Sequence, residues 1–455
     1  MKPKRVLIVS SPTCEDDKTQ ASLIYLATFF NEAGLEFDLL DLSGNIDYFD
    51  PPEDFFSPCD SEYWLSPRIF HDAQWLDAYL PSDYQRYDAV FYSSLFSPDI
   101  LILGRHALIQ KKHYANCSTI IGGAAINCLN DTQLSVLSEV FAHICIGYDI
   151  ADMIFQIFSK KGSSSSHLCR SYITAKNPPV LRPNYGLLDI RPFITVYSGH
   201  GCDWGRCRFC NSQSLSEQGY YSRSPENIAK DFEDISKANG KVRDVMLSSD
   251  SFTRNDLVEL MSCLRQKGSR VPYNLMLRGD QWISKEIGES LKESGCTDVF
   301  IGAESLNNDV LRILNKGIST ESIIGAVKCL SNYVKVIVGL LLFIPQVTER
   351  QLDKQLINLE KVLPYVHAVE PEILSVIQGT EFAVHNEGYG IKLWTTDRTI
   401  NDSWCYGLSP DIPWTFDDKK EADMWFSHYD ELRTLLGGFV QQHYWDSIDH
   451  IRLRF

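Results

Sequence analysis

Three cysteines, Cys202, Cys207 and Cys210, lie within nine residues of one another in the segment GHGCDWGRCRFCNSQ. Thiolates this close together can hold a metal ion or a metal cluster. A structural zinc site normally takes four protein ligands, and the only histidine nearby in sequence is His200. Three thiolates can instead hold a [4Fe–4S] cluster and leave one iron open to a small molecule that receives an electron. A third interpretation, three buried structural cysteines, suits this polar segment poorly.

The elements that must position these cysteines form a series of strands and helices that begins near residue 190. Helical segments separate six strand candidates, at 194–199, 244–249, 273–279, 298–304, 335–345 and 368–377. Six such units with parallel strands predict a partial or full βα barrel, whose chemistry lies at the C-terminal ends of the strands. The cysteines directly follow the first strand, so they stand where a catalytic centre is expected.

The first part of the chain predicts a Rossmann-like, doubly wound α/β domain, because apolar strands such as KRVLIV and YDAVFYS alternate with helical segments. Such sheets bind ligands beyond the carboxyl ends of their strands. That edge would carry Ser10, Ser11, Pro12, Ser93, Ser94, Gly122 and Gly123. An insertion at 42–86 is rich in aromatic residues and aspartate, and a small packed cap explains it better than a binding platform does.

A serine-rich stretch, KKGSSSSHLC, marks a linker between the two series. We therefore expect a Rossmann-like domain at 1–160, a linker at 161–185, a barrel at 186–395 and a C-terminal extension at 396–455.

Composition restricts the class of partner. The chain has 455 residues and a net charge of -16, which disfavours nucleic acid or an anionic membrane as partner. The longest apolar run, VIVGLLLFIP, is about half the length that a membrane span needs. Thirteen cysteines, mostly in apolar segments, indicate a reducing compartment. We expect a cytoplasmic protein.

The cysteine segment resembles that of the radical S-adenosylmethionine (SAM) superfamily. In that family three cysteines after the first barrel strand hold a [4Fe–4S] cluster, and its open iron binds the amino and carboxylate groups of SAM. Reductive cleavage then yields a 5′-deoxyadenosyl radical that abstracts hydrogen from the substrate. The usual spacing is CxxxCxxC with an aromatic residue before the last cysteine. Phe209 supplies that aromatic residue, but the first gap is one residue longer here.

Other segments extend the resemblance. DVFIGAESLNNDVLRILNKGIS is similar to the family's fourth-strand motif, and QGT at 378–380 to the turn after the sixth strand. SSDSF stands where many members bind the methionyl amino group, and an arginine ends the third strand. The resemblance thus implies SAM contacts, although each position could also be an ordinary polar residue at the barrel mouth. These candidates are Ser248, Ser249, Asp250, Arg278, Gly302, Glu304 and Gln378.

The N-terminal domain resembles the cobalamin-binding domain fused to many radical SAM enzymes, which include methyltransferases and modifiers of ribosomally made peptides. Ser10, Ser94, Gly122 and Gly123 would then line the cofactor. The sequence lacks an Asp-x-His-x-x-Gly segment, and Gly147-Tyr148-Asp149-Ile150 replaces the frequent Gly-Glu-Gly-Glu. A Rossmann-like scaffold that docks substrate is the alternative.

Three functions remain open. The first is cobalamin-dependent methylation of an unactivated carbon. The second is cobalamin-independent modification of a peptide, such as epimerisation, in which Cys405 would donate a hydrogen atom unless it is a buried structural cysteine. The third is a non-catalytic zinc- or cluster-binding protein. Either enzyme would act on a small molecule or a peptide and would need an external electron donor of the flavodoxin or ferredoxin type.

Overall fold

The computed structural model describes residues 5–12, 18–43, 84–95, 99–159, 167–172, 181–212, 219–238, 242–393 and 414–442, together with 74, 77, 80, 82, 411, 412, 444 and 445. Among these residues, no helix is both long and apolar enough to cross a membrane. The chain divides into two compact units. Residues 1–195 make up most of the first, and 196–236, 243–393 and 413–455 make up the second.

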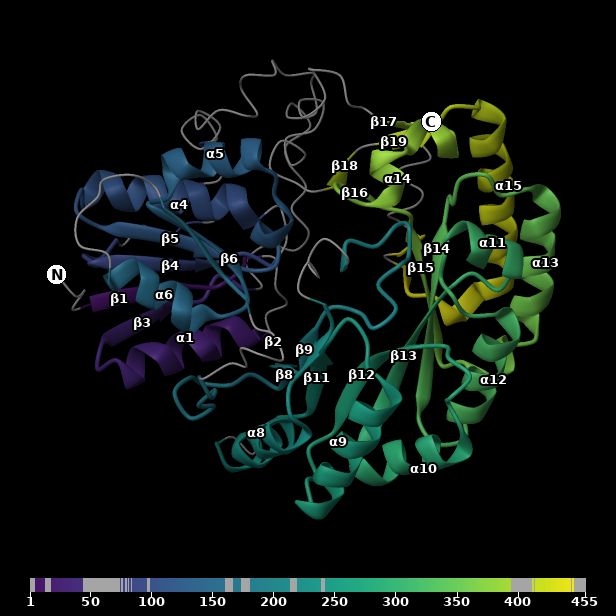
Figure 1. Cartoon of the computed structure of the whole chain (residues 1–455), viewed down its shortest axis with the longest axis horizontal. Coiled ribbons are helices and arrows are strands. Elements are labelled where there is room, and N and C mark those ends of the chain that lie inside the picture. Colours follow the sequence, from purple (N-terminus) through teal and green to yellow (C-terminus); the bar gives the residue numbers. More distant parts are fainter. Residues whose placement is uncertain are drawn as a thin grey trace. The chain divides into compact units, whose positions relative to one another are not determined.

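The first unit is a parallel sheet with helices on both faces (Figure 1). Its strands neighbour one another in the order β3-β1-β4-β5-β6-β7. The strands are β1 (Arg5–Val9), β3 (Glu36–Leu40), β4 (Ala89–Ser93), β5 (Ser118–Gly122), β6 (His143–Gly147) and β7 (His167–Ser171), with the short strand β2 (Lys18–Thr19) outside this order. The helices are α1 (Ala21–Glu32), α4 (Asp99–His113), α5 (Asp131–Val140) and α6 (Ile150–Ser159).

Strand β1 shows why helices cover both faces of this sheet. Its residues Val6 to Val9 are all buried, as expected for a parallel strand with both faces covered. Leu7 and Val9 belong to the apolar cluster that includes α4 and α5. Val6 and Ile8 belong to a second cluster with α1 and α6. The two clusters confirm the predicted doubly wound arrangement.

The second unit contains parallel strands that neighbour one another in chain order, β8-β11-β12-β13-β14-β15. Sequential order is what a βα barrel requires. The strands are β8 (Phe193–Tyr197), β11 (Asp244–Ser248), β12 (Tyr273–Arg278), β13 (Cys296–Glu304), β14 (Lys335–Leu342) and β15 (Ala368–Ile373). The helices between them are α8 (Pro225–Ala238), α9 (Arg254–Gln266), α10 (Lys285–Ser294), α11 (Asn308–Ile313), α12 (Thr320–Leu330) and α13 (Glu349–Glu360).

The helices lie on the outer face of this curved sheet (Figure 1). Along β13, Val299, Ile301 and Ala303 are fully buried, whereas the residues between them, up to Glu304, are only partly buried. This period of two places one face against the helices and the other toward the interior of the barrel.

The C-terminal segments complete the second unit. Helix α15 (Lys419–Leu436) packs where β14 ends, because the Trp425 Nε1–H donates to the Ile344 carbonyl at 3.0 Å. Phe343 takes a positive φ of 59° and so ends β14 three residues before the predicted boundary. The smaller elements are β9 (Gly199–His200), β10 (Tyr221–Ser222), β16 (Val376–Ile377), α14 (Glu381–Val384), β17 (Ile391–Leu393), β18 (Asp411–Ile412) and β19 (Trp414–Phe416).

The predicted fold class is confirmed: a Rossmann-like parallel sheet precedes an incomplete α/β barrel. One strand prediction differs in detail, because the segment 368–377 forms β15 and the separate short strand β16. The domain boundaries at 160, 185 and 395 stay predictions. Most of the insertion at 42–86 lies outside the described residues.

Candidate active site

The three cysteines lie in the loop that follows β8 and β9, at the carboxyl end of the first barrel strand as predicted. Two glycines allow the backbone to reach this position. A Cβ atom on Gly199 would lie 2.4 Å from the Tyr221 carbonyl oxygen, and one on Gly201 would lie 2.7 Å from the Gly219 carbonyl oxygen. The loop therefore begins where two backbone segments pass too closely for any side chain. We call residues 201–210 the cysteine loop.

The segment after β11 fixes one side of the cysteine loop. The Gly201 N–H donates to Asp250 Oδ2 at 2.8 Å, and the Ser251 hydroxyl donates to Asp203 Oδ1 at 2.9 Å. Asp250 therefore bonds to the residue directly before the first cysteine. Ser249 instead donates its hydroxyl to the Ser251 carbonyl at 2.7 Å, so that hydroxyl serves the local turn.

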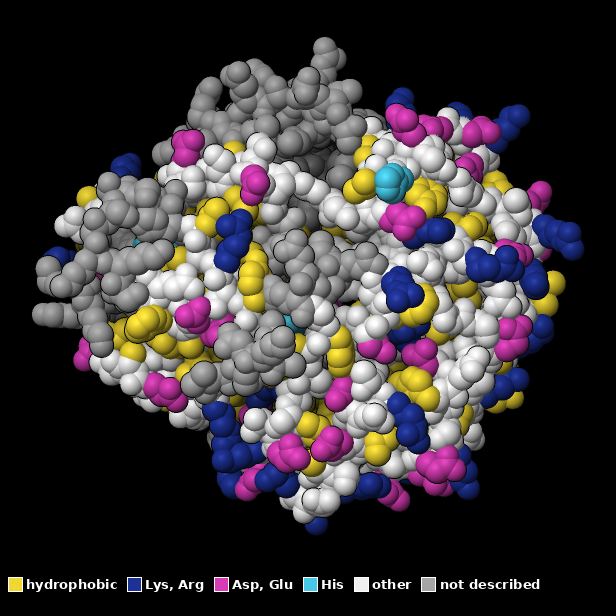
Figure 2. Space-filling model, in the orientation of Figure 1, with side chains coloured by type: hydrophobic (Ala, Val, Ile, Leu, Met, Phe, Trp, Pro, Cys, Tyr) yellow, Lys and Arg dark blue, Asp and Glu magenta, His cyan; other side chains and the backbone are white. Residues whose placement is uncertain are grey.

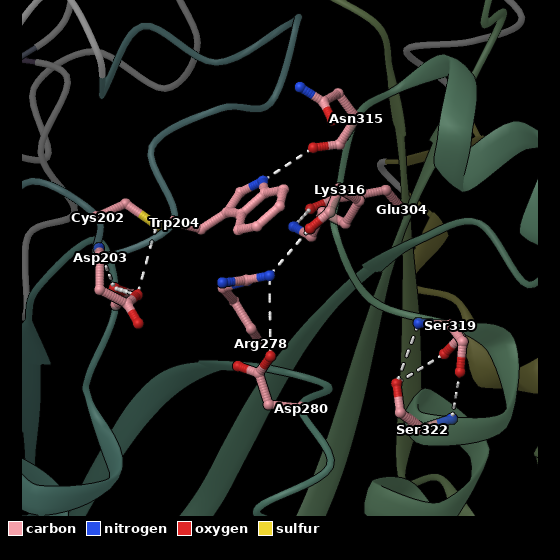
Figure 3. A network of polar contacts seen from close by, with 11 residues as sticks. Cys202, Asp203, Trp204, Arg278, Asp280, Glu304, Asn315, Lys316, Ser319 and Ser322 are labelled. Atoms are coloured by element: carbon pink, nitrogen blue, oxygen red, sulfur yellow. Dashed lines mark hydrogen bonds and ion pairs between the residues drawn. The ribbon is translucent and has the colours of Figure 1, made fainter.

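A second anchor comes from the turn between α11 and α12 (Figure 3). The Trp204 indole N–H donates to the Asn315 carbonyl at 2.8 Å, and the Arg208 N–H donates to the Leu314 carbonyl at 3.0 Å. Gly317, with φ at 72°, lies under the indole: a Cβ atom there would be 2.2 Å from the ring. The side chain of Trp204 thus fastens the cysteine loop to this turn.

A third anchor comes from the start of α14. The Arg208 guanidinium forms an ion pair with Glu381 at 2.9 Å, and the Phe382 N–H donates to the Arg208 carbonyl at 3.2 Å. Gln378 lies in the turn before this helix, and Thr380 caps it by accepting from the Ala383 N–H. The cysteine loop is therefore held from three separate segments of the second unit.

The environment of Cys207 and Cys210 favours neutral thiols before metal is bound. Burial raises the pKa of the Cys207 thiol to about 12, although the nearby Lys316 ammonium opposes this. Burial also raises the pKa of Cys210, and hydrogen bonds with Ser212 oppose it. Metal binding here must therefore release protons, as thiolate ligation generally does. In the described part of the chain, no three His, Cys, Asp or Glu side chains are grouped to hold a single metal ion.

Next to the cysteine loop lies a cluster of charged side chains from the ends of β12 and β13 (Figure 3). Lys316 Nζ contacts Glu304 Oε1 at 2.7 Å, and the two side chains are 9% and 15% exposed. Gly302 leaves room for this pair, because a Cβ atom there would lie 3.0 Å from Glu304 Oε1. Glu304 itself has φ at 62°.

Arg278 lies against the same cluster. Its Nη2–H donates to the Lys316 carbonyl at 2.9 Å, and its guanidinium lies 5.1 Å from the centre of a Trp204 ring. Asp280 is 3.7 Å away, an ion pair at the long end of the range. The Nε–H of Arg278 is buried and has no hydrogen-bond partner among the described residues. A buried donor without a partner suits an anionic ligand that is yet to bind.

The structure thus brings together most of the predicted site residues of the second unit. Phe209, between the second and third cysteines, lies under the Lys316 ammonium, 5.8 Å from ring centre to nitrogen. Ser248 contributes its backbone carbonyl, which accepts from the N–H of Ser198 at 3.0 Å. The cofactor roles of these residues stay predictions. The cluster comprises Cys202, Cys207, Cys210, Phe209, Ser248, Ser249, Asp250, Arg278, Gly302 and Glu304.

The candidates in the first unit lie at the carboxyl ends of their strands. Ser10 is fully buried, and its hydroxyl donates to Asp41 at 2.9 Å and accepts from the Leu42 N–H at 2.6 Å. Ser94 is also fully buried. Gly122 ends β5, and Gly123 has φ at 118°. Cys405 lies outside the described residues.

Sequence reasoning missed Trp204, Lys316 and the pair of Arg208 with Glu381. Trp204 occupies the lengthened gap between the first two cysteines, and that extra length was the available signal. Lys316 stands in the motif NKG, whose asparagine and glycine favour left-handed backbone. That pattern indicates a tight turn but not the inward direction of the lysine.

The family model and the curated relatives each match part of this chain. Residues 196–355 match the family model described as the radical SAM superfamily. A bacteriochlorophyllide d C-12(1)-methyltransferase of Chlorobaculum tepidum is 25% identical over 248 residues, 52% of each chain. An uncharacterized methyltransferase of Pyrococcus horikoshii is 26% identical over 155 residues, 32% of this chain and 33% of the relative. The matches thus span about a third to a half of these curated relatives.

Solved structures match nearly the whole chain at low identity, which shows a shared fold. TsrM from Kitasatospora setae, described as a radical SAM methyltransferase with tryptophan and a SAM analogue bound, gives a TM-score of 0.66 at 12% identity, over 96% of this chain and 91% of TsrM. OxsB, described as a cobalamin-dependent SAM radical enzyme, gives 0.64 at 14% identity, over 94% of this chain and 66% of OxsB.

Proposed function

Because residues 196–355 form a radical SAM domain, we propose that this enzyme cleaves SAM reductively at a [4Fe–4S] cluster and methylates an unactivated carbon with the help of cobalamin. When bound, the cluster would supply one electron to SAM, and cobalamin would carry the methyl group. The observation that supports methylation best is that the likeness to OxsB and TsrM extends over 94% and 96% of the chain, and so includes the sheet before the barrel.

The residues present fit these groups. Cys202, Cys207 and Cys210 would hold three irons, in a loop that three anchors fix before any metal arrives. Fixed ligands lower the cost of ordering the loop on binding. The buried Nε–H of Arg278 can donate to the SAM carboxylate, as its position at the end of β12 suggests.

Two carboxylates would complete the SAM site. Asp250 lies at the mouth of the barrel beside the first cysteine, where its charge suits the methionyl ammonium. Gly302 and Glu304 would lie along the adenosine, as the resemblance of this strand to the family's fourth-strand motif implies. Ser248, Ser249, Phe209 and Gln378 would line the rest.

Cobalamin would bind at the carboxyl edge of the sheet in the first unit. The strand ends there carry Ser10, Ser94, Gly122 and Gly123, and the positive φ of Gly123 keeps side chains off the backbone. A Cβ atom on Gly123 would lie 2.2 Å from the Ser94 carbonyl oxygen. Gly123 thus lets two strand ends approach closely at the edge where a large planar cofactor would lie.

Both curated relatives carry methyltransferase names, which favours methyl transfer over epimerisation. The TsrM structure was solved with tryptophan as substrate, and by analogy a small molecule or a peptide residue is the substrate class here. A flavodoxin- or ferredoxin-type protein would deliver the electron.

Anaerobic reconstitution with iron and sulfide, with and without hydroxocobalamin, tests this proposal. We expect 5′-deoxyadenosine or S-adenosylhomocysteine after addition of SAM and reductant, and corrinoid that stays with the protein through desalting. Replacing Cys202, Cys207 and Cys210 together by alanine should abolish product and iron. The same substitution at Cys263, on the outer helix α9, is the matched control and should change neither. Full iron loading with no SAM cleavage, even with candidate substrates, would refute the proposal.

A further inference from the structure

Lys316 places a buried positive charge beside the cysteine loop. The residue is 7% exposed although it belongs to a turn between two helices. Its neighbours Asn315 and Gly317 both take left-handed backbone, with φ of 53° and 72°. Two left-handed residues around one ordinary residue reverse the chain sharply, and the side chain of Lys316 consequently points toward the barrel rather than into solvent (Figure 3).

The turn cannot readily move the ammonium away. The Asn315 carbonyl accepts from Trp204 at 2.8 Å, and the Lys316 carbonyl accepts from Arg278 at 2.9 Å. The indole of Trp204 also lies against Gly317. Each residue of the turn is therefore held by a partner from the cysteine loop or from β12. A charge fixed in this way acts on its surroundings without reorganising.

The ammonium is surrounded by one anion, one aromatic ring, the cysteines and a second cation, the Arg278 guanidinium. Glu304 Oε1 is 2.7 Å away, and the ring of Phe209 is 5.8 Å away. Burial lowers the pKa of Lys316, but Glu304 and Cys207 outweigh it, and the net shift is upward. Lys316 and Glu304 also act on Cys207 with opposite sign, because the ammonium favours the thiolate and the carboxylate disfavours it.

From this geometry we infer that Lys316 and Glu304 form a charge pair that sets the reduction potential of the cluster bound by Cys202, Cys207 and Cys210. Lys316 raises the potential, since a nearby positive charge stabilises the more negative, reduced cluster, and Glu304 lowers it. Charge and burial around a cluster are known determinants of its potential, and burial strengthens both effects. The inference rests on the proposed function, because it requires a cluster.

A purely structural role for Lys316 predicts something different. If the lysine only neutralised Glu304 and filled space, removing either charge would loosen the same turn, and both variants would change in the same direction. A charge effect instead predicts shifts of opposite sign from the two halves of one ion pair. The sign of the shift therefore separates the two explanations.

The test measures the midpoint potential by potentiometric titration, with the electron paramagnetic resonance signal of the reduced cluster as readout. The full chain is reconstituted anaerobically, without SAM, at one pH, and iron and sulfide are determined for each sample. We expect Lys316→Met to shift the midpoint to more negative potential and Glu304→Gln to more positive potential. Lys316→Arg, which keeps the charge, should stay close to wild type.

Lys328→Met is the matched control. Lys328 also lies over an aromatic ring, with its ammonium 5.2 Å from the centre of Tyr365, but it stands on the outer helix α12. The same loss of charge there should leave the midpoint unchanged. A shift equal to that of Lys316→Met would mean that net charge, not position, is measured, and would overturn the inference.

Three further results would overturn it. The first is a wild-type midpoint in Lys316→Met at full iron loading. The second is a shift in the same direction in Lys316→Met and Glu304→Gln. The third is loss of the cluster from both Lys316→Met and Lys316→Gln while Glu304→Gln keeps the wild-type midpoint, which would make the lysine structural. If the wild-type protein itself takes up no cluster, the proposed function fails, and that result is distinct from all of these.

Discussion

Gly317 satisfies two structural requirements that no residue with a side chain can satisfy together. Its backbone is left-handed, and the indole of Trp204 occupies the place of a Cβ atom. We expect Gly317→Ala to lower the free energy of unfolding by about 2–5 kcal/mol, the sum of the left-handed backbone cost and of overpacking. Denaturant titration of the cluster-free protein measures this, and iron uptake should fall as well.

Gly325 offers a control of opposite sign. It lies inside α12, and a Cβ atom there would contact nothing within 4 Å. Gly325→Ala should therefore raise the free energy of unfolding by about 0.5–1 kcal/mol through helix propensity. If both variants lost stability equally, the contact with Trp204 would not be the cause.

His106 makes the first unit sensitive to acid. The ring is buried, its Nδ1 lies 2.9 Å from the Tyr92 hydroxyl, and burial lowers its pKa to about 4. Between about pH 6.5 and pH 4, His106 binds a proton in the unfolded chain but stays neutral in the folded protein. Stability is thus lost as pH falls through this window, by up to about 1.4 kcal/mol per unit. His106→Gln should flatten this part of the stability profile, and NMR titration of the ring should show a neutral imidazole at pH 5.

The sequence predicted the cysteine site because the spacing of the three cysteines is local. It could not predict the residues that anchor the cysteine loop. Trp204 and its acceptor Asn315 are 111 residues apart, and neither segment contains a pattern that predicts contact with the other. The inward direction of Lys316 could not be predicted for the same reason, since the direction of a side chain in a tight turn depends on tertiary contacts.

At the level of elements, the N-terminal cap of helix α12 should affect the stability of the protein but not its candidate active site. Ser319 caps it with a capping box, in which its hydroxyl accepts from the Ser322 N–H at 3.1 Å (Figure 3). Ser319→Ala should cost about 1 kcal/mol of unfolding free energy. Iron content and midpoint potential should stay at wild-type values, because the cap serves the helix alone. A changed potential with an intact fold would contradict this separation.

The strands of both units could be predicted from the pattern of apolar residues and from composition, because parallel strands covered by helices are apolar and bounded by turns. Strand ends were harder to predict. The apolar run at 335–345 continues beyond β14, but the positive φ of Phe343 ends the strand within it. Its side chain packs on Phe426 of α15, a contact that comes from far along the chain.

At the level of the whole molecule, our proposal assigns the two cofactors to different units. Ser10, Ser94, Gly122 and Gly123 belong to the first, and the cysteines to the second. We therefore expect the triple cysteine-to-alanine variant to keep wild-type corrinoid binding after it has lost its iron. Absorbance of desalted protein measures both. Loss of corrinoid together with iron would show that the sites depend on each other.

The chain carries a net charge of -16. On the face shown in Figure 2, lysine and arginine side chains are interspersed with aspartate and glutamate. Composition could predict the total charge but not this mixing, because mixing depends on which residues the fold brings to one face.

The three anchors of the cysteine loop also constrain when the protein can mature. All of them follow the loop in the chain, and the last, Glu381, belongs to the segment after β16. A ribosome adds about 5–20 residues per second, so the thiols are made roughly ten seconds or more before the last of these anchors exists. During that interval the nascent thiols are open to oxidation and to stray metal ions. Cluster insertion therefore belongs after translation, and cells that assemble this protein slowly or in air should accumulate mismetallated chains.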